Sequence, residues 1–415
     1  MKLLHLADLH LGKSLHNLSL TESGDQDYWI DQILAFIAEQ RPDAVAIAGD
    51  VYDRGVPARE AVPLLSRLLT RIARMEIPVF LTGGNHDGGD RLEFLSELVQ
   101  DNNVYIAGSV RREMLHVTRD FHDGYGPVTF WLMPYAFPAA VRQALELSEE
   151  ETPSYTASVR RLLEAQQIDF TQRNVLIAHQ TVLCNGSEPE HSLSETAVGG
   201  VGGIDAAVFD GFDYVALGHI HGAQKVGGER IRYAGSPLCY HFSEAGQRKG
   251  PLMVTLKGKD SLPEAETAEL TPLHRVRPTM KGKTEDIIAA EQQSTVRGEY
   301  VQVVLTDERV APNTRDMLTA LFESHGCRLV DLGRESEARH TKADDSSGRY
   351  SEELPLDELF LRFWRKQTGK DDPEADELEL IRFAAAQVGA GLEKTGDELA
   401  EALAQFAVKQ EVDAE

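Results

Sequence analysis

Short apolar runs alternate with helical patterns over about the first 260 residues, and this alternation constrains the fold most strongly. The runs are rich in Val, Ile and Leu and lie at 3–7, 44–48, 78–81, 129–133, 175–178, 214–217, 231–234 and 252–256. Helical stretches separate several of them, at 26–39, 59–75 and 91–100. Such alternation predicts an α/β fold with a partly parallel, buried sheet. Because ligands of such folds bind beyond the carboxyl ends of the strands, the polar residues there are candidates for function.

The composition is that of a globular protein and excludes nucleic-acid binding by charge alone. Of 415 residues, 42% are hydrophobic and 26% charged, and the formal net charge is −25. A protein that coats phosphates with Lys and Arg should be basic, whereas bound cations can invert the local field of an acidic protein.

Three cysteines, Cys184, Cys239 and Cys327, show no CxxC spacing and are expected to be packing residues, not disulfides or zinc ligands. No signal peptide is recognisable, and no apolar window approaches the roughly 18 residues of a membrane span. The sequence therefore predicts a soluble, cytoplasmic protein.

Changes of composition divide the chain after residue 270. Residues 271–333 contain strand-like runs around a helical run at 314–323, which predicts a small α+β domain. Residues 334–353 form a polar linker. Residues 354–415 are helical and acidic, and an apolar stripe is formed by Leu356, Leu359, Phe360, Phe363 and Trp364. This segment is either a docking element for a partner or a small bundle that closes on itself.

Five short motifs of Asp, Gly, Asn and His follow the predicted strands. They are Asp8-Leu9-His10, Gly49-Asp50, Gly84-Asn85-His86-Asp87, His179 and Gly218-His219-Ile220-His221. Each alone has an ordinary explanation, such as a turn or a cap, but their shared placement at the ends of buried strands does not. Because residues i and i+2 of a strand point to the same side, Asp8 with His10 and His219 with His221 form two-ligand pairs.

Seven of these side chains form a candidate ligand set for divalent metal: Asp8, His10, Asp50, Asn85, His179, His219 and His221. Mixed Asp, Asn and His ligands suit manganese, iron or zinc, whereas magnesium and calcium prefer oxygen alone. Seven ligands are too many for one tetrahedral ion and are sufficient for two ions that share Asp50. Two ions about 4 Å apart can activate water and neutralise both oxygens of an in-line displacement at phosphorus.

His86 follows the candidate ligand Asn85 and is the expected catalytic residue. It can protonate the leaving oxygen or stabilise charge on phosphorus, and Asp87 can hold its other ring nitrogen. Four basic residues near the motifs are expected phosphate contacts or ordinary solvated charges: Lys13, Arg54, Arg59 and Arg91. His16 and His241 are weaker candidates for the substrate path.

In their order and spacing, the motifs resemble those of the calcineurin-like metallophosphoesterases over about residues 1–260. The resemblance implies two packed sheets flanked by helices, with a dinuclear metal site between them. One ion would be held by Asp8, His10, Asp50 and His221, and the other by Asp50, Asn85, His179 and His219. His86 would be catalytic, with Asp87 orienting it.

Four longer stretches resemble the SbcD family, the nuclease subunits of bacterial SbcCD complexes. They are LHLADLHLGK at 4–13, AGDVYD at 48–53, YAGSPL at 233–238 and FSEAG at 242–246. The resemblance implies a manganese-dependent exonuclease and endonuclease that acts on DNA ends and hairpins in repair, recombination and replication. It also implies a nuclease domain at 1–270, a capping domain at 271–333 and a tail at 354–415 that docks on a coiled-coil ATPase, SbcC.

The same resemblance implies a homodimer, with the helices at 59–75 and 91–100 as candidate contacts. Archaeal relatives place a histidine three residues after the bridging Asp, where this chain has Asp53, so a second catalytic histidine is in doubt. Two other functions are weighed against the nuclease. One is a metallophosphoesterase for a small phosphodiester or nucleotide, and the other is a scaffolding subunit whose metals serve structure.

Overall fold

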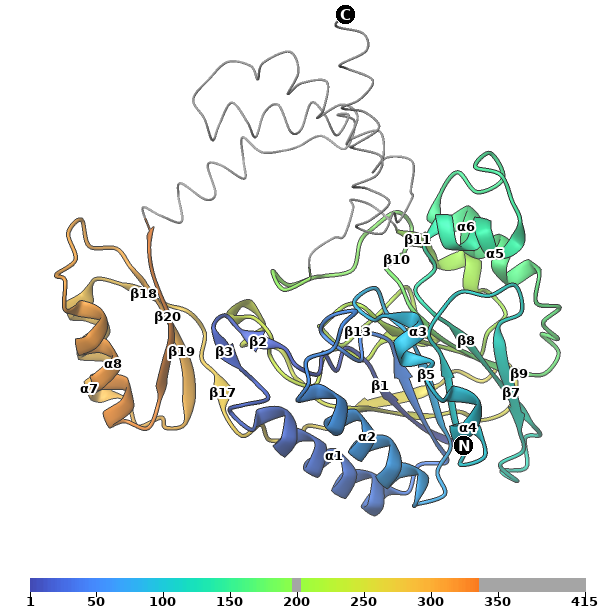
Figure 1. Ribbon diagram of the computed structural model, residues 1–415, viewed down its shortest axis with the longest axis horizontal. Coiled ribbons are helices and arrows are strands. Elements are labelled where there is room, and N and C mark those ends of the chain that lie inside the picture. The colour runs from blue at the N-terminus through green and yellow to red at the C-terminus, as the bar shows by residue number, and fades with distance from the viewer. Residues whose placement is uncertain (196–202, 336–415) are drawn as a thin grey trace, which may run out of the picture. The chain divides into compact units, whose positions relative to one another are not determined.

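Two six-stranded sheets face each other in the computed structural model of the protein, which describes residues 1–195 and 203–335 (Figure 1). The first sheet has four parallel strands, β1 (Lys2–Leu6), β4 (Ala44–Ala48), β5 (Val79–Thr82) and β6 (Val104–Ala107), and two antiparallel strands, β15 (Leu252–Thr255) and β16 (Glu264–Thr267). In the second, β8 (Val128–Met133), β9 (Arg173–His179), β12 (Tyr214–Gly218) and β14 (Ile231–Tyr233) are parallel, with antiparallel edges β7 (Leu115–Arg119) and β13 (Gln224–Lys225).

Alternation of side chains along each strand builds the layers. In β1, Leu4 and Leu6 face the helices α1 (Asp25–Gln40) and α2 (Ala61–Ala73), whereas Leu3 faces the second sheet. Alanines of β4 and stacked Phe80 and Phe130 fill the space between the sheets, with ring centroids 4.1 Å apart. The helices α5 (Pro138–Leu145) and α6 (Tyr155–Glu164) cover the outer face of the second sheet (Figure 1). The predicted two-sheet α/β sandwich is confirmed.

Shorter elements complete the region of the two six-stranded sheets. They are β2 (Ser14–Leu15) paired with β3 (Leu18–Ser19), β10 (Val182–Leu183) paired with β11 (Ile204–Asp205), the helices α3 (Gly89–Leu92) and α4 (Ser96–Gln100), and the 3-10 turns Ala206–Phe209 and Phe242–Glu244. The eight predicted strands are all present, but the single helix predicted at 91–100 is wrong. Leu95 has a left-handed backbone with φ of 63°, which ends a right-handed helix and separates α3 from α4.

A smaller sheet with two helices follows. Its strands β17 (Arg275–Val276), β18 (Met280–Gly282) and β20 (Arg328–Arg334) all pair in parallel with β19 (Glu299–Leu305). The helices α7 (Thr284–Gln293) and α8 (Thr314–Ser324) pack on it through a separate core that includes Ile287, Leu318 and Phe322. This region contains the strand–helix–strand order predicted for 300–332.

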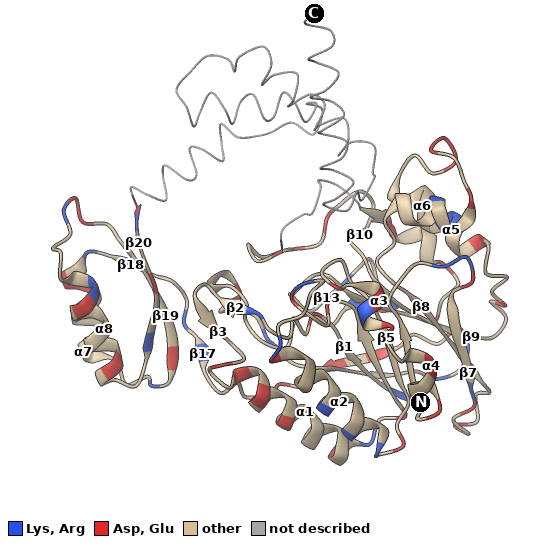
Figure 2. Ribbon diagram, in the orientation of Figure 1, with Lys and Arg blue, Asp and Glu red and all other residues tan. Residues whose placement is uncertain are grey.

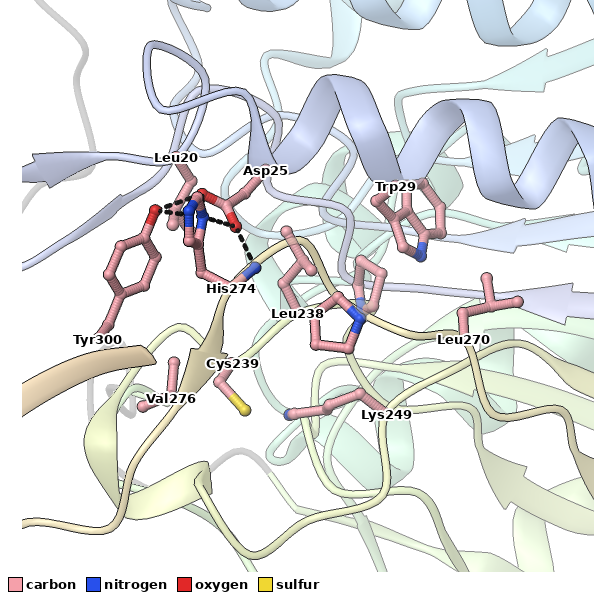
Figure 3. A pocket seen from close by; sticks show the side chains of 12 residues that line it. Leu20, Asp25, Trp29, Leu238, Cys239, Lys249, Leu270, His274, Val276 and Tyr300 are labelled. Carbon is pink, nitrogen blue, oxygen red and sulfur yellow. Dashed lines mark hydrogen bonds and ion pairs between the residues drawn. The ribbon is translucent and has the colours of Figure 1, made fainter. Parts of the chain in front are cut away.

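Three polar side chains join this smaller sheet to α1. The hydroxyl of Tyr300 donates to the buried carboxylate of Asp25 at 2.6 Å, and Nδ1 of His274 lies 3.1 Å from the same carboxylate (Figure 3). The triad closes one end of a pocket lined by apolar side chains, among them Trp29 and Leu238.

Most of the predicted linker and all of the predicted docking segment, including the stripe at 356–364, lie outside the described residues. Within 1–195 and 203–335, no helix is both long and apolar enough to cross a membrane. Acidic and basic residues are interspersed over the described elements (Figure 2).

Candidate metal centre

The five motifs meet where the parallel strands of both sheets end. Asp8 and His10 follow β1, Asp50 follows β4, and Asn85 follows β5 in the first sheet. His179 ends β9 in the second sheet, and His219 and His221 follow β12. The sandwich thus brings residues that are up to 213 positions apart in the chain to one edge, as the strand-end pattern predicts.

The backbone at these strand ends is bent sharply. Asp8, His10, Asp50 and His219 have φ values of 53°, 40°, 46° and 101°, in a region that L-residues rarely adopt. A left-handed residue with a side chain costs roughly 1–2 kcal/mol, so the surrounding packing must impose these conformations. Gly84 permits the close approach of two loops, because a Cβ there would collide with the Asp50 carboxylate.

Asp8, His10 and His221 form one half of the cluster. Their ligand atoms lie within 4.8 Å of one another, and Nε2 of His10 is 3.2 Å from Nε2 of His221. Asp8 accepts the N–H of His219 at 2.8 Å through Oδ1, while its buried Oδ2 has no hydrogen-bond partner among the described residues. A buried carboxylate oxygen without a partner beside two imidazoles is what a cation-binding position offers.

Asp50, His179 and His219 form the other half. Their ligand atoms also lie within 4.8 Å, and Oδ1 of Asn85 is 3.2 Å from Nε2 of His179 and 3.0 Å from Nδ1 of His219. Nδ1 of His179 must carry its proton, because it donates to the carbonyl of Ala48 at 2.8 Å. In the neutral ring, Nε2 is then free to bind a metal.

The carboxylate of Asp50 lies between the two halves. Its Oδ2 is 3.5 Å from Nε2 of His10 and 3.2 Å from Nε2 of His179. Its Oδ1 accepts the N–H of His86 at 2.9 Å, which fixes the orientation of the carboxylate. The central position predicted for Asp50 follows from these contacts.

Burial dominates the electrostatics of the cluster. It raises the pKa of Asp8 to about 7, and it lowers the pKa of His10 to about 4 and that of His219 to about 3. Burial also opposes the charge of His179, but the neighbouring Asp50 outweighs it and raises the pKa of His179 to about 9. The neutral imidazoles of His10 and His219, together with the carboxylates of Asp8 and Asp50, are donors of the kind that hold a divalent metal. His179 would give up its Nε2 proton to such an ion, so the residues present fit one.

His86 projects from this cluster toward solvent. Its side chain is 30% exposed, compared with 3% for Asp50, and its Nε2 lies 3.9 Å from Oδ2 of Asp50. Nδ1 of His86 is 3.0 Å from the carbonyl of Asp53 and donates to it, since a carbonyl only accepts. The backbone of the loop after β4 therefore orients the ring.

The prediction that Asp87 orients His86 is wrong. The Asp87 carboxylate accepts three backbone N–H groups, from Val51 at 3.0 Å, Tyr52 at 2.9 Å and Gly84 at 2.9 Å. These bonds tie the loop after β5 to the loop after β4. Asp87 supports the positions of Asp50 and Asn85 and does not touch the imidazole.

Glu244 contacts a candidate ligand but was not singled out from the sequence. Its buried carboxylate lies 3.1 Å from Nδ1 of His221 and 2.6 Å from Nζ of Lys249. Although burial alone would raise the pKa of Glu244, the hydrogen bond from His221 and the charge of Lys249 lower it well below its ordinary value. Glu244 lies in the stretch FSEAG at 242–246, which supported the family resemblance but assigned no role to this residue.

The four basic residues expected to contact phosphate differ in their contacts and exposure. Lys13 is 2.7 Å from the carboxylate of Asp53, and Arg91 donates to the carbonyl of Gly55. Arg54 and Arg59 are exposed. His16 and His241 lie together, with ring centroids 5.8 Å apart, beside Phe242.

Two family models and a solved structure show what the chain is similar to. Residues 1–223 match the calcineurin-like phosphoesterase family, and residues 269–368 match the SbcD C-terminal family, described as the type 5 capsule protein repressor C-terminal domain. Among solved structures, the chain is similar to the crystal structure of TT1561 of Thermus thermophilus, with 12% identity and a TM-score of 0.36, over 64% of this chain and 98% of that chain.

The two family matches confirm the resemblance drawn from the motifs, both to the calcineurin-like enzymes and to the domain combination of the SbcD family. The first match alone spans more than half of the chain. The chain belongs to the calcineurin-like phosphoesterase family and is a metal-dependent phosphoesterase.

Proposed function

We propose that this phosphoesterase is a DNA exonuclease and endonuclease that hydrolyses phosphodiester bonds at DNA ends and hairpins, as the nuclease subunit of an SbcCD-type repair complex. One observation carries the proposal. An SbcD C-terminal match follows, on the same chain, a phosphoesterase region whose seven candidate ligands all converge. On this basis residues 1–270 are the nuclease domain, 271–333 the capping domain and 354–415 the docking segment for the ATPase.

The proposed cofactors are two divalent ions, manganese by preference. Asp8, His10, Asp50 and His221 would hold one ion, and Asp50, Asn85, His179 and His219 would hold the other. Such ions lower the pKa of water and neutralise charge on phosphoryl oxygens. Four imidazoles among the seven ligands favour manganese over magnesium or calcium.

His86 is proposed to protonate the leaving oxygen. With Nδ1 held by the carbonyl of Asp53, Nε2 faces the cluster and is the atom available to the substrate. As the bond between phosphorus and the sugar oxygen breaks, the imidazolium gives its Nε2 proton to that oxygen and releases it as an alcohol. The neutral ring then recovers a proton from solvent before the next turnover.

A homodimer is proposed through the surface formed by α2, α3 and α4. Four apolar side chains on α2, on α4 and in the link between α3 and α4 are unusually exposed: Val62 (45%), Phe94 (74%), Leu95 (53%) and Leu98 (64%). They border a groove of about 550 Å³ lined by further apolar side chains, including Leu69 and Val99. An exposed apolar patch of this kind is typical of a protein–protein interface.

A nuclease assay on the purified chain tests the function. Labelled single-stranded, duplex and hairpin DNA would be incubated with manganese, with and without the ATPase partner and ATP, beside bis-p-nitrophenyl phosphate. We expect DNA cleavage that His86→Ala reduces at least about 100-fold while manganese binding persists. His122→Ala is the control, since that side chain is 88% exposed. Turnover of the small ester without DNA cleavage under either condition would contradict the proposal.

A further inference from the structure

Three aromatic side chains gather beside two of the candidate ligands. The ring of Tyr135 lies 5.9 Å from that of His219 and 6.1 Å from that of His179, measured between centroids. Tyr135 comes just after β8, the strand next to β9, and its backbone N–H donates to the carbonyl of Gly83 at 2.9 Å. The chain thus fixes this ring between the loop after β5 and the end of β9.

Phe137 and Tyr155 extend the aromatic surface away from the cluster. The Phe137 ring is 4.5 Å from the Tyr135 ring, and Tyr155, in the first turn of α6, is 6.4 Å away. Tyr135 is half-buried, whereas Phe137 is 38% exposed. Burial, with Tyr155 adding to it, raises the pKa of Tyr135 above its ordinary value, so the phenol stays neutral. The ring contacts of Tyr135 thus run from two candidate ligands to Phe137, a side chain that solvent reaches.

We propose that Tyr135 and Phe137 form a stacking platform for the nucleobase next to the phosphodiester bond that is hydrolysed. The inference rests on the proposed function, because it assumes a nucleic-acid phosphodiester at the cluster. Only the sugar separates a base from its phosphate, and the Tyr135 ring lies next to the rings that would hold the metal. Stacking accepts any base but requires it to leave its pair, so the platform selects an unpaired nucleotide.

Two features distinguish this surface from an ordinary exposed aromatic residue. Phe170 has similar exposure, at 41%, but its ring meets only the buried Phe212 edge-on at 5.3 Å, within the pairs of rings that the structure describes. Tyr135, by contrast, contacts two imidazoles of the cluster and two aromatic neighbours. Phe170 therefore serves as the matched control.

The test compares substrates that differ only in the base. Thymidine 5′- and 3′-(p-nitrophenyl phosphate) would each be paired with the abasic deoxyribose ester, and the ratio of their kcat/KM values would be measured with manganese. Because both members of a pair use the same metals and the same His86, damage to the cluster cancels in the ratio. We expect wild type to prefer one of the base-containing esters by about 10-fold or more.

Variants then show which side chains cause the preference for the base-containing ester. Phe137→Ala and Tyr135→Leu should bring the ratio close to one, whereas Tyr135→Phe and Phe170→Ala should retain it. A wild-type ratio near one on both esters, or a ratio that survives both Phe137→Ala and Tyr135→Leu, would overturn the platform. If wild type cleaves DNA but shows no base preference, the platform is contradicted and the nuclease function is retained. If wild type does not cleave DNA, both proposals are contradicted.

Discussion

Replacing Glu244 by Gln should weaken metal binding and destabilise the protein together. The substitution keeps the shape of the side chain but removes a buried charge that faces His221 at 3.1 Å and Lys249 at 2.6 Å. The pKa of Glu244 lies well below its ordinary value, despite the burial that opposes ionisation, so this charge is present at neutral pH. The variant therefore leaves an 11%-exposed ammonium without its counter-ion.

The magnitude follows from these contacts. Removing one partner of a buried ion pair costs about 3–5 kcal/mol, and the lower end applies here, since Lys249 keeps hydrogen bonds to Ser236 and to the carbonyl of His221. About 3 kcal/mol corresponds to a Tm lower by roughly 6 °C in a domain of this size. Loss of the carboxylate behind a metal-binding histidine weakens metal affinity by about 10- to 100-fold.

Calorimetric titration with manganese and thermal unfolding without metal measure the two effects separately. In the double variant Glu244→Gln with Lys249→Met, the uncompensated charge is gone, so stability should recover while manganese affinity stays low. Glu264→Gln is the control, because Glu264 pairs with Lys257 at the surface and is 68% exposed. Wild-type manganese affinity in Glu244→Gln would refute the claim that this carboxylate positions His221.

Three further predictions concern other parts of the molecule. Asp87→Asn should cost about 2 kcal/mol in urea unfolding, because its new amide group faces backbone N–H donors that the carboxylate satisfied. Burial would raise the pKa of Asp123, but Arg173 and the N-terminal ammonium lower it below its ordinary value. Its stabilisation is therefore present above about pH 4 and lost as the pH falls further, so unfolding of wild type and Asp123→Asn should differ at pH 7 and converge in acid. Phe94→Glu should convert a dimer into a monomer in light scattering with little change in Tm, since the side chain is 74% exposed, and an unchanged mass would exclude that surface.

The sequence predicted the elements that depend on local pattern. The run at 44–48 became β4 with the same bounds, and the leucines of α2 face the core at the helical period. The convergence of the candidate ligands was predictable because strand ends in a parallel sheet share one edge. This prediction needed no knowledge of the conformation of the loops.

Contacts between distant segments were not predictable. Asp87 adjoins His86 in the chain, yet its carboxylate turns to backbone N–H groups, some of them in a loop about 35 residues away. Glu244 meets His221 across 23 positions, and no periodicity marks such a pair. The break at Leu95 has the same origin, since leucine favours helix and only its surroundings impose the left-handed backbone.

Electron paramagnetic resonance of the manganese-loaded chain tests the central claim most directly. Asp50 should join the two halves into one centre, because its Oδ2 lies within 3.5 Å of both His10 and His179. We predict about two bound ions per chain with an exchange-coupled spectrum in wild type, and loss of the coupling in Asp50→Asn. A single uncoupled ion in the saturated wild-type chain, or coupling that survives in Asp50→Asn, would contradict a two-metal centre joined by Asp50.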